Sequence, residues 1–198
     1  MTQLSNRVKQ HFLDSIAVKQ AVMDDLAPAV ALVAERLLQC FMEEGKVLAC
    51  GNGGSAADAQ HFAAEMVGRF EKERPGLAAI SLSTDTSILT AIANDYDFDV
   101  IFSKQVRAIG QAGDILLAIS TSGNSENVIQ AIHAAHERGM VVVALTGKDG
   151  GEIGRLLNMD DLHLNVATTR TARIQEVHLL MIHALCDAVD SLLLGEGE

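Results

Sequence analysis

Residues 114–125 read Asp-Ile-Leu-Leu-Ala-Ile-Ser-Thr-Ser-Gly-Asn-Ser and contain the pattern that most clearly indicates the architecture of this chain. A short apolar run over 114–119 passes into a loop of hydroxyl side chains with one glycine over 120–125. Apolar residues at helical spacing follow over 128–135. The order of strand, polar loop and helix is typical of the βα unit from which parallel sheets are built.

The same order recurs along most of the chain. Further short apolar runs occupy residues 46–50, 78–82, 141–145 and 162–166, and the last helical pattern extends from about residue 171 to 194. No hairpin signal joins these runs, so we expect a parallel sheet with helices on both faces. The predicted fold class is α/β, a three-layer sandwich around a five-stranded parallel sheet.

Residues 1–45 precede the first predicted strand and carry two apolar patterns at helical spacing. The first consists of Leu4, Val8, Phe12 and Ile16, and the second of Val30, Val33, Leu37 and Phe41. Because Pro28 lies between them, we interpret the segment as a helical hairpin before an α/β core over 46–198, all within one domain. The stripes exceed what one sheet face can use, so we expect oligomerisation helices and a dimer of dimers.

The composition excludes several classes of protein. A formal net charge of -11 argues against a nucleic-acid partner, because phosphate backbones need clustered Lys and Arg. No apolar run approaches the roughly 18 residues needed to cross a bilayer, and the N-terminus lacks a signal pattern, so we expect a cytoplasmic protein without a membrane partner. Cys40, Cys50 and Cys186 stand in apolar surroundings and are expected to be reduced thiols in the core.

The loop after the first predicted strand, Gly-Asn-Gly-Gly-Ser at 51–55, combines glycines with the start of a helix. Glycines let backbone amides approach a ligand, and the helix N-terminus favours an anion. With Ala56 the loop matches the Gly-x-Gly-x-x-Ala dinucleotide fingerprint, which requires an acidic residue about 20 positions further on. The match is weak because the first acidic residue after the second strand is Asp85. A plain glycine-rich turn is the alternative.

The hydroxyl-rich loop at 120–125 is more specific. Its hydroxyl side chains and glycine before a helix make a neutral anion cradle, in which side-chain and amide donors meet phosphate oxygens. No Lys follows the glycine, which excludes a nucleoside-triphosphate loop. Ser and Asn are also ordinary helix caps, but a cap accounts for a single hydroxyl. The loop at 146–151, Thr-Gly-Lys-Asp-Gly-Gly, is interpreted as a plain turn.

Two helical segments carry ionisable side chains. In His-Phe-Ala-Ala-Glu, residues 61–65, the imidazole and the carboxylate share one helix face, which suits a surface ion pair, a buried hydrogen bond or half of a metal and acid–base site. In the last helix, Gln175, His178 and His183 lie among large apolar residues. Taking Gln175 as reference, His183 lies about 80° to one side and His178 about 60° to the other, so periodicity does not choose between the histidines. Each histidine alone is more often a buried structural residue than a ligand.

Several motifs occur in a fixed order along the chain. They are Gly-Asn-Gly-Gly-Ser (51–55), Gln-His-Phe-Ala-Ala-Glu (60–65), Asn-Asp-Tyr (94–96), Ser-Thr-Ser-Gly-Asn-Ser (120–125), Leu-Thr-Gly-Lys-Asp-Gly-Gly (145–151) and Arg-Ile-Gln-Glu-Val-His (173–178), with a second His five positions on. Together they resemble the phosphoheptose isomerase family of the sugar isomerase (SIS) domain superfamily, over nearly the whole chain. The resemblance implies flavodoxin-like strand order and interconversion of sedoheptulose 7-phosphate with D-glycero-D-manno-heptose 7-phosphate, the first step toward the ADP-heptose of bacterial lipopolysaccharide core.

The resemblance also implies where the site lies. The phosphate contacts fall on Ser120, Thr121, Ser122 and Ser125, and the sugar contacts on Asn52, Gly53, Gly54, Ser55, Glu65, Asn94, Asp95 and Gln175. One zinc ion per subunit would be bound by His61, Glu65, Gln175 and His183, which favours His183 over His178. The family is a homotetramer with active sites at subunit boundaries. Some members have Asp where this chain has Ala172, so the resemblance predicts the loss of a sugar hydroxyl contact and leaves substrate preference open.

The chemistry of such an isomerase requires these residue types. A proton beside a carbonyl is removed, an enediolate is held, and the proton returns to the neighbouring carbon. A carboxylate can take the carbon-bound proton and an imidazole can serve the oxygens, so Glu65 is the expected base and His183 its acid–base partner. Polar donors or a metal stabilise the developing oxyanion, although zinc bound to the carboxylate would weaken it as a base.

Two other classes of function share much of this pattern. One is a non-catalytic scaffold resembling the relative that associates with the bacterial replication initiator, which has small or amide residues where this chain has Glu65 and His183. The other is a sugar-phosphate-sensing domain, which would leave the same two residues without a role. Because both residues are present, the sequence favours the enzyme.

Overall fold

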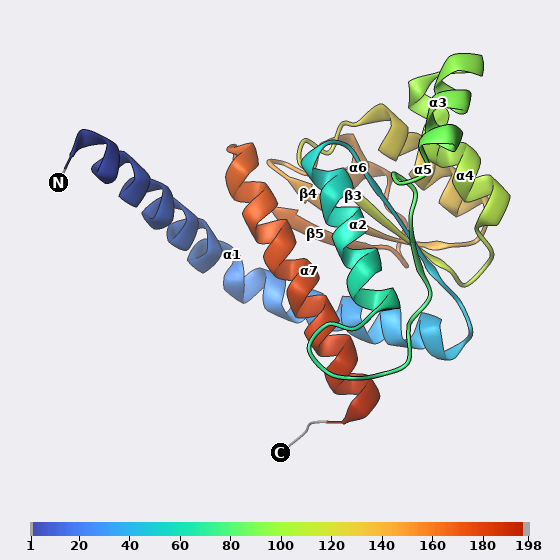
Figure 1. Ribbon diagram of the computed structural model, residues 1–198, viewed down its shortest axis with the longest axis horizontal. Helices are drawn as coiled ribbons and strands as arrows, with labels where there is room; N and C mark the ends of the chain where they lie inside the picture. The colour runs from blue at the N-terminus through green and yellow to red at the C-terminus, as the bar shows by residue number, and fades with distance from the viewer. Residues whose placement is uncertain (1, 196–198) are drawn as a thin grey trace.

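The protein, described by a computed structural model over residues 2–195, folds around a parallel sheet (Figure 1). Its strands are β1 (Val47–Gly51), β2 (Ala79–Ser81), β3 (Ile115–Ser120), β4 (Val141–Gly147) and β5 (Leu162–Val166). They form a five-stranded sheet in the order β2-β1-β3-β4-β5, and every neighbouring pair is parallel. The α/β class, the number of strands and the flavodoxin-like order are therefore confirmed.

Helices cover both faces of the sheet. They are α1 (Gln3–Met42), α2 (Gly54–Val67), α3 (Thr86–Asp95), α4 (Ile101–Ile109), α5 (Glu126–Glu137), α6 (Gly151–Leu156) and α7 (Thr171–Leu194), with a 3₁₀ turn η1 (Phe98–Val100) before α4. In β3, Ile115 and Leu117 join the core cluster under α1, α2 and α7, whereas Leu116 joins the cluster under α4 and α5. Every residue of β3 is buried, which is why this strand reads as a continuous apolar run rather than an alternating one.

The predicted N-terminal helical hairpin is wrong, because α1 is one helix of 40 residues with Pro28 inside it. An interior proline removes one hydrogen bond and costs about 3 kcal/mol. The stripe that α1 buries nevertheless crosses this position, since Leu26 and Val30 flank it and both pack in the core. Continuous burial on both sides of Pro28 outweighs the lost bond, and the chain does not turn there.

The two halves of α1 differ in burial. Val33 and Leu37, in the second half, are buried against the sheet, so this half belongs to the core. In the first half, Leu4 is 70% exposed and Phe12 is 68% exposed. In Figure 1 this half extends away from the sheet. The core therefore includes the second half of α1 together with the sheet, and the exposed stripe of Leu4 and Phe12 belongs to the first half.

Helix α7 is long and apolar enough to cross a membrane by length and composition, with a mean hydropathy of 1.6 in its most apolar window. The expectation concerned uninterrupted apolar runs, and in α7 the stretch without Asp, Glu, Lys or Arg extends only over 177–186, between Glu176 and Asp187. The structure accounts for the composition, because α7 packs between α1 and α2 and also contacts β4 and β5. Its buried residues, including Ile174, Ile182 and Val189, belong to the main core cluster. Such burial is typical of a core helix.

Cys40, Cys50 and Cys186 are free and buried. Burial raises the pKa of the Cys50 thiol to about 12. The expectation of reduced core thiols is confirmed, and a buried thiol of this kind is a poor metal ligand.

Candidate active site

The two predicted ligand loops meet at one edge of the sheet. Strands β1 and β3 are neighbours, so the loops that follow Gly51 and Ser120 lie side by side at their carboxyl ends. The strand order reverses at this point, which is where ligands bind in open α/β sheets. The amide side chains of Asn52 and Asn127 join the loops by donating to each other, at 2.8 and 3.0 Å.

Three of the predicted phosphate ligands converge in the loop after β3. The Oγ atom of Ser120 lies 2.8 Å from Ser125 Oγ and 3.4 Å from Ser122 Oγ. Ser125 is the N-cap residue of α5, yet its side chain makes no capping bond to the helix. The alternative that this hydroxyl is an ordinary cap therefore fails. Thr121 is half-buried in the same loop. The arrangement is an uncharged cradle at the N-terminus of a helix, which favours an anion such as phosphate.

The loop after β4, interpreted from the sequence as a plain turn, supports this cradle. A Cβ atom on Gly123, whose φ is +66°, would lie 2.1 Å from the carbonyl oxygen of Gly150. Asn124 Oδ1 accepts a hydrogen bond from the Glu152 amide at 2.9 Å, and Gly123 O accepts one from Ile153. The glycines thus allow two loops to touch through their backbones, which fixes the shape of the cradle.

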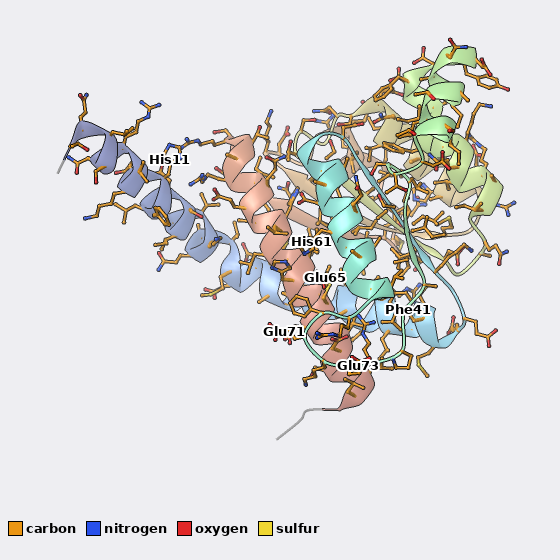
Figure 2. The ribbon with its side chains drawn as sticks, viewed as in Figure 1. His11, Phe41, His61, Glu65, Glu71 and Glu73 are labelled. Atoms are coloured by element: carbon orange, nitrogen blue, oxygen red, sulfur yellow. The ribbon has the colours of Figure 1, made fainter. Side chains whose placement is uncertain are left out.

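The last helix, α7, adds a third side chain to the pair formed by His61 and Glu65, whose role the sequence left open. His61 Nε2 lies 3.2 Å from Glu65 Oε1 on α2 and 3.0 Å from His183 Nε2 on α7. Figure 2 shows His61 and Glu65 on α2, where this helix runs beside α7. The His61 side chain is 39% exposed and the Glu65 side chain 24% exposed, while Phe70 packs 5.6 Å from the His183 ring. We call His61, Glu65 and His183 the acid–base cluster.

The structure separates the two histidines that periodicity left open. His183 belongs to the acid–base cluster, whereas His178 is fully buried and its Nε2 lies 2.8 Å from the carbonyl oxygen of Thr146. Desolvation lowers the pKa of His178 to about 4, and the hydrogen bond to Thr146 opposes this shift. His178 is therefore a neutral structural residue that ties α7 to β4.

Three predicted site residues lie apart from the cluster. Gln175 packs against the first loop, because a Cβ on Gly54 would lie 2.2 Å from its Nε2. Asn94 and Asp95 end α3, are exposed, and hydrogen-bond to each other at 2.8 Å. The main contacts of α3 are with η1 and α4, and in Figure 1 it stands at the edge opposite α7. Within one chain, α3 does not reach the acid–base cluster. Ala172, at the first turn of α7, is exposed.

The cluster fits part of a zinc site. Two donors bound at about 2.1 Å to a tetrahedral zinc ion lie about 3.4 Å apart. The distances from His61 Nε2 to His183 and Glu65 are close to this, at 3.0 and 3.2 Å. Among residues 2–195, however, no group of three His, Cys, Asp or Glu side chains is arranged to hold a metal by itself, and no hydrogen bond joins Gln175 to the cluster. The donor types of the cluster fit zinc, but the fourth expected ligand, Gln175, lies apart from the other three.

Asn127 is a site residue that sequence analysis missed. It is only 2% exposed and holds the Asn52 amide, so the amide predicted to contact sugar is already paired within the protein. The available signal was an amide in the first turn of a helix whose neighbours, Val128 and Ile129, are apolar and buried. That signal cannot identify the partner, because Asn52 lies 75 residues away.

The fold and these loops define the class of protein. The family model described as SIS domain matches residues 10–147. Over 193 residues the chain is 69% identical to phosphoheptose isomerase of Laribacter hongkongensis, covering 98% of each chain. The structure of phosphoheptose isomerase from Neisseria gonorrhoeae superimposes with a TM-score of 0.91 at 60% identity, covering 96% of this chain and 100% of that one. The phosphoheptose isomerase structure from Francisella tularensis gives a TM-score of 0.92 at 45% identity, with coverage of 96% and 100%.

The chain belongs to the phosphoheptose isomerase family. It is therefore an isomerase whose substrate is a phosphorylated heptose. The non-catalytic scaffold considered from the sequence is not favoured, because the relatives matched over the whole chain carry the name of the enzyme.

Replacing Gly123 by Ala should weaken phosphate binding by about tenfold or more, because the new Cβ would push the loop after β4 away from the hydroxyl cradle. Gly113→Ala is the matched control: its φ of +90° imposes similar backbone strain, but nothing lies within 4 Å of the added atom. Calorimetric titration with inorganic phosphate measures the difference. Equal losses in the two variants would mean that strain, rather than loop contact, is responsible.

Proposed function

We propose that this protein interconverts sedoheptulose 7-phosphate and D-glycero-D-manno-heptose 7-phosphate. The observation that carries the proposal is the position of the acid–base cluster, because two of its members, His61 and Glu65, lie on α2, whose first turn adjoins the phosphate cradle. His61 follows Gly54 by seven residues, which is about 10 Å along α2. A seven-carbon sugar phosphate lying along α2 would keep its phosphate at the cradle and bring its reacting carbons to the cluster.

The proposed mechanism assigns the proton transfers to two residues of the cluster and a positioning role to the third. Glu65 removes the proton from C1 of the ketose and returns it to C2, which forms the aldose through an enediolate. His183 moves the proton between the oxygens on C1 and C2. His61 lies within hydrogen-bond distance of both partners, at 3.2 Å from Glu65 and 3.0 Å from His183, and so holds them in one group.

Phosphorylated sugars do not cross membranes freely, and we place the enzyme in the cytoplasm.

Glu65→Gln keeps the size of the side chain and removes the base, so kcat should fall by about 100-fold or more while phosphate binding is retained. Glu73→Gln is the control, because its side chain is 90% exposed on the loop after α2 (Figure 2). A coupled assay for aldose formation measures both variants. Wild-type turnover in Glu65→Gln would show that the base is misassigned.

We propose that one zinc ion per chain binds at the acid–base cluster. His61, Glu65 and His183 would hold it, and Gln175 would complete the set after turning from Gly54 toward the cluster. These donors are two nitrogens and two oxygens, a set acceptable to zinc but weaker than thiolates. When bound, zinc would supply electrophilic stabilisation of the enediolate oxygens.

Elemental analysis after mild purification should detect zinc, and the zinc content should fall in His61→Ala because a nitrogen donor is lost. His133→Ala provides the control, since His133 lies on α5 away from the cluster. Absence of divalent metal together with activity that survives a chelator would leave the cluster as a metal-free acid–base site.

We propose that the protein assembles as a homotetramer through the first half of α1. An open apolar groove of about 550 Å³ runs between α1 and α7 and is lined by residues including Ile16, Met23, Leu180 and Met181. Ile16 and Met23 are 51% and 57% exposed. Monomeric proteins rarely leave a contiguous apolar surface of this kind uncovered. Assembly would also bring a neighbour's α3, with Asn94 and Asp95, to a site that one chain leaves incomplete.

Phe12→Asp should dissociate the assembly and lower activity, because a charge would have to be buried at the subunit contact. Met159→Asp is the control, since Met159 is fully exposed in the turn before β5. Light scattering after size exclusion gives the mass of each variant. A wild-type monomer with full activity would contradict both the tetramer and a shared site.

A further inference from the structure

We propose that Arg74 and Asp190 are positioning residues for the isomerase: their buried ion pair fixes the spacing of α2 and α7, and thereby the geometry of Glu65 and His183. This inference rests on the proposed function of the cluster. Arg74 Nε lies 2.5 Å from Asp190 Oδ1, and the two side chains are 0% and 2% exposed. Among residues 2–195, no hydrogen bond or ion pair joins either side chain to the cluster side chains, so the action of the pair would be indirect.

Arg74 also caps the helix that carries the proposed base. The last carbonyl groups of a helix have no partner within it, and their orientation depends on what else they meet. In α2, Arg74 Nη2 donates to the carbonyl oxygen of Glu65 at 2.9 Å, and Nη1 donates to that of Met66 at 2.8 Å. The guanidinium therefore holds the backbone of Glu65 itself.

Asp190 carries the other half of the connection. It follows His183 by seven residues, which returns to almost the same face of α7 two turns further on. Helices α2 and α7 run in the same direction, since Gly54 meets Gln175, His61 meets His183, and the end of α2 meets Asp190 through Arg74. The ion pair is the third of these contacts and the most deeply buried.

The cluster cannot fix this spacing by itself. It joins the helices by one hydrogen bond between half-exposed rings, whereas the ion pair combines a charged contact with two backbone contacts in the interior. The buried thiol of Cys186 lies on α7, between His183 and Asp190 in the sequence. Burial is the largest cause that raises its pKa to about 12; the carboxylates of Glu65 and Asp190 act in the same direction, and Arg74 opposes them.

The pair is better suited to fixing geometry than to stabilising the fold. A buried ion pair is often no more stabilising than apolar residues of the same volume. Here Asp190 Oδ2 is buried without a hydrogen-bond partner among the described residues, which adds a desolvation cost. What the pair does provide is direction, because the planar guanidinium aims its donors along fixed lines at α2 and α7.

The test uses the double variant Arg74→Met/Asp190→Leu, which removes both charges and leaves neither buried alone. Arg74→Lys keeps the positive charge but lacks the planar guanidinium that donates to both helices. Lys46→Met is the matched control, because Lys46 Nζ pairs with the buried Asp114 at 2.6 Å at the amino ends of β1 and β3, and the side-chain hydrogen bonds of this pair do not involve α2 or α7. Each folded variant is assayed for kcat, KM and the pH dependence of kcat with sedoheptulose 7-phosphate.

In the double variant, kcat should fall by about 10-fold to 100-fold, the loss expected for misplaced catalytic groups, while KM changes by less than about threefold because the cradle is intact. The pH dependence of kcat should change together with kcat. The kcat of Arg74→Lys should lie between the values for the wild type and the double variant. Lys46→Met should lower the melting temperature and leave kcat unchanged. A folded double variant with wild-type kcat and pH profile, or an equal loss of kcat in Lys46→Met, would overturn the proposal.

A second readout does not depend on turnover. Histidine Cε1–H chemical shifts measured by NMR at one pH report the surroundings of His61 and His183, with His136 on α5 as an internal reference. These chemical shifts should change in the double variant and not in Lys46→Met, and unchanged chemical shifts in the double variant would overturn the proposal. A wild-type protein inactive on sedoheptulose 7-phosphate would instead contradict the proposed function, and the NMR comparison would still decide whether the ion pair positions the cluster.

Discussion

The packing of α7 against α2 is the interaction on which the site depends. These helices lie more than a hundred residues apart in the sequence, yet together they supply every member of the acid–base cluster. Neither helix could hold the cluster alone, because an isolated helix of the length of α2 is marginal in water and His183 on α7 would have no partner. The apolar positions of α7, from Ile174 to Val189, provide the burial that keeps both helices on one face of the sheet.

The phosphate cradle is built without a cation. The chain carries a net charge of -11, and the loop after β3 offers hydroxyl groups, backbone amides and a helix N-terminus. Such a site attracts an anion only at short range, so selectivity depends on fit rather than on long-range steering. This explains why two further loops support it: one through the Asn52–Asn127 pair, and one through the contact of Gly123 with Gly150. Rigid donors compensate for the missing positive charge.

The sequence predicted the sheet well and the site only partly. Fully buried strands such as β3 give unbroken apolar runs, and the bounds of α7 followed directly from its periodicity. Pro28 misled the interpretation because local propensity predicts a break there, whereas the decisive burial of Leu26 and Val30 depends on tertiary packing. His178 and His183 could not be distinguished by angle, since their difference lies in the partners, Thr146 and His61, that the fold brings to them.

The position of α7 in the chain also bears on how the protein is made. During synthesis the N-terminal parts emerge first, and α7 follows every strand of the sheet. Until residues 171–194 have left the ribosome, the sheet face that carries Leu117 and Leu145 lacks one of its covering helices. While α7 is still being made, the nascent chain therefore exposes apolar surface that the native fold buries. The acid–base cluster also lacks His183 until α7 has been made. The cluster and the last core helix are therefore completed together.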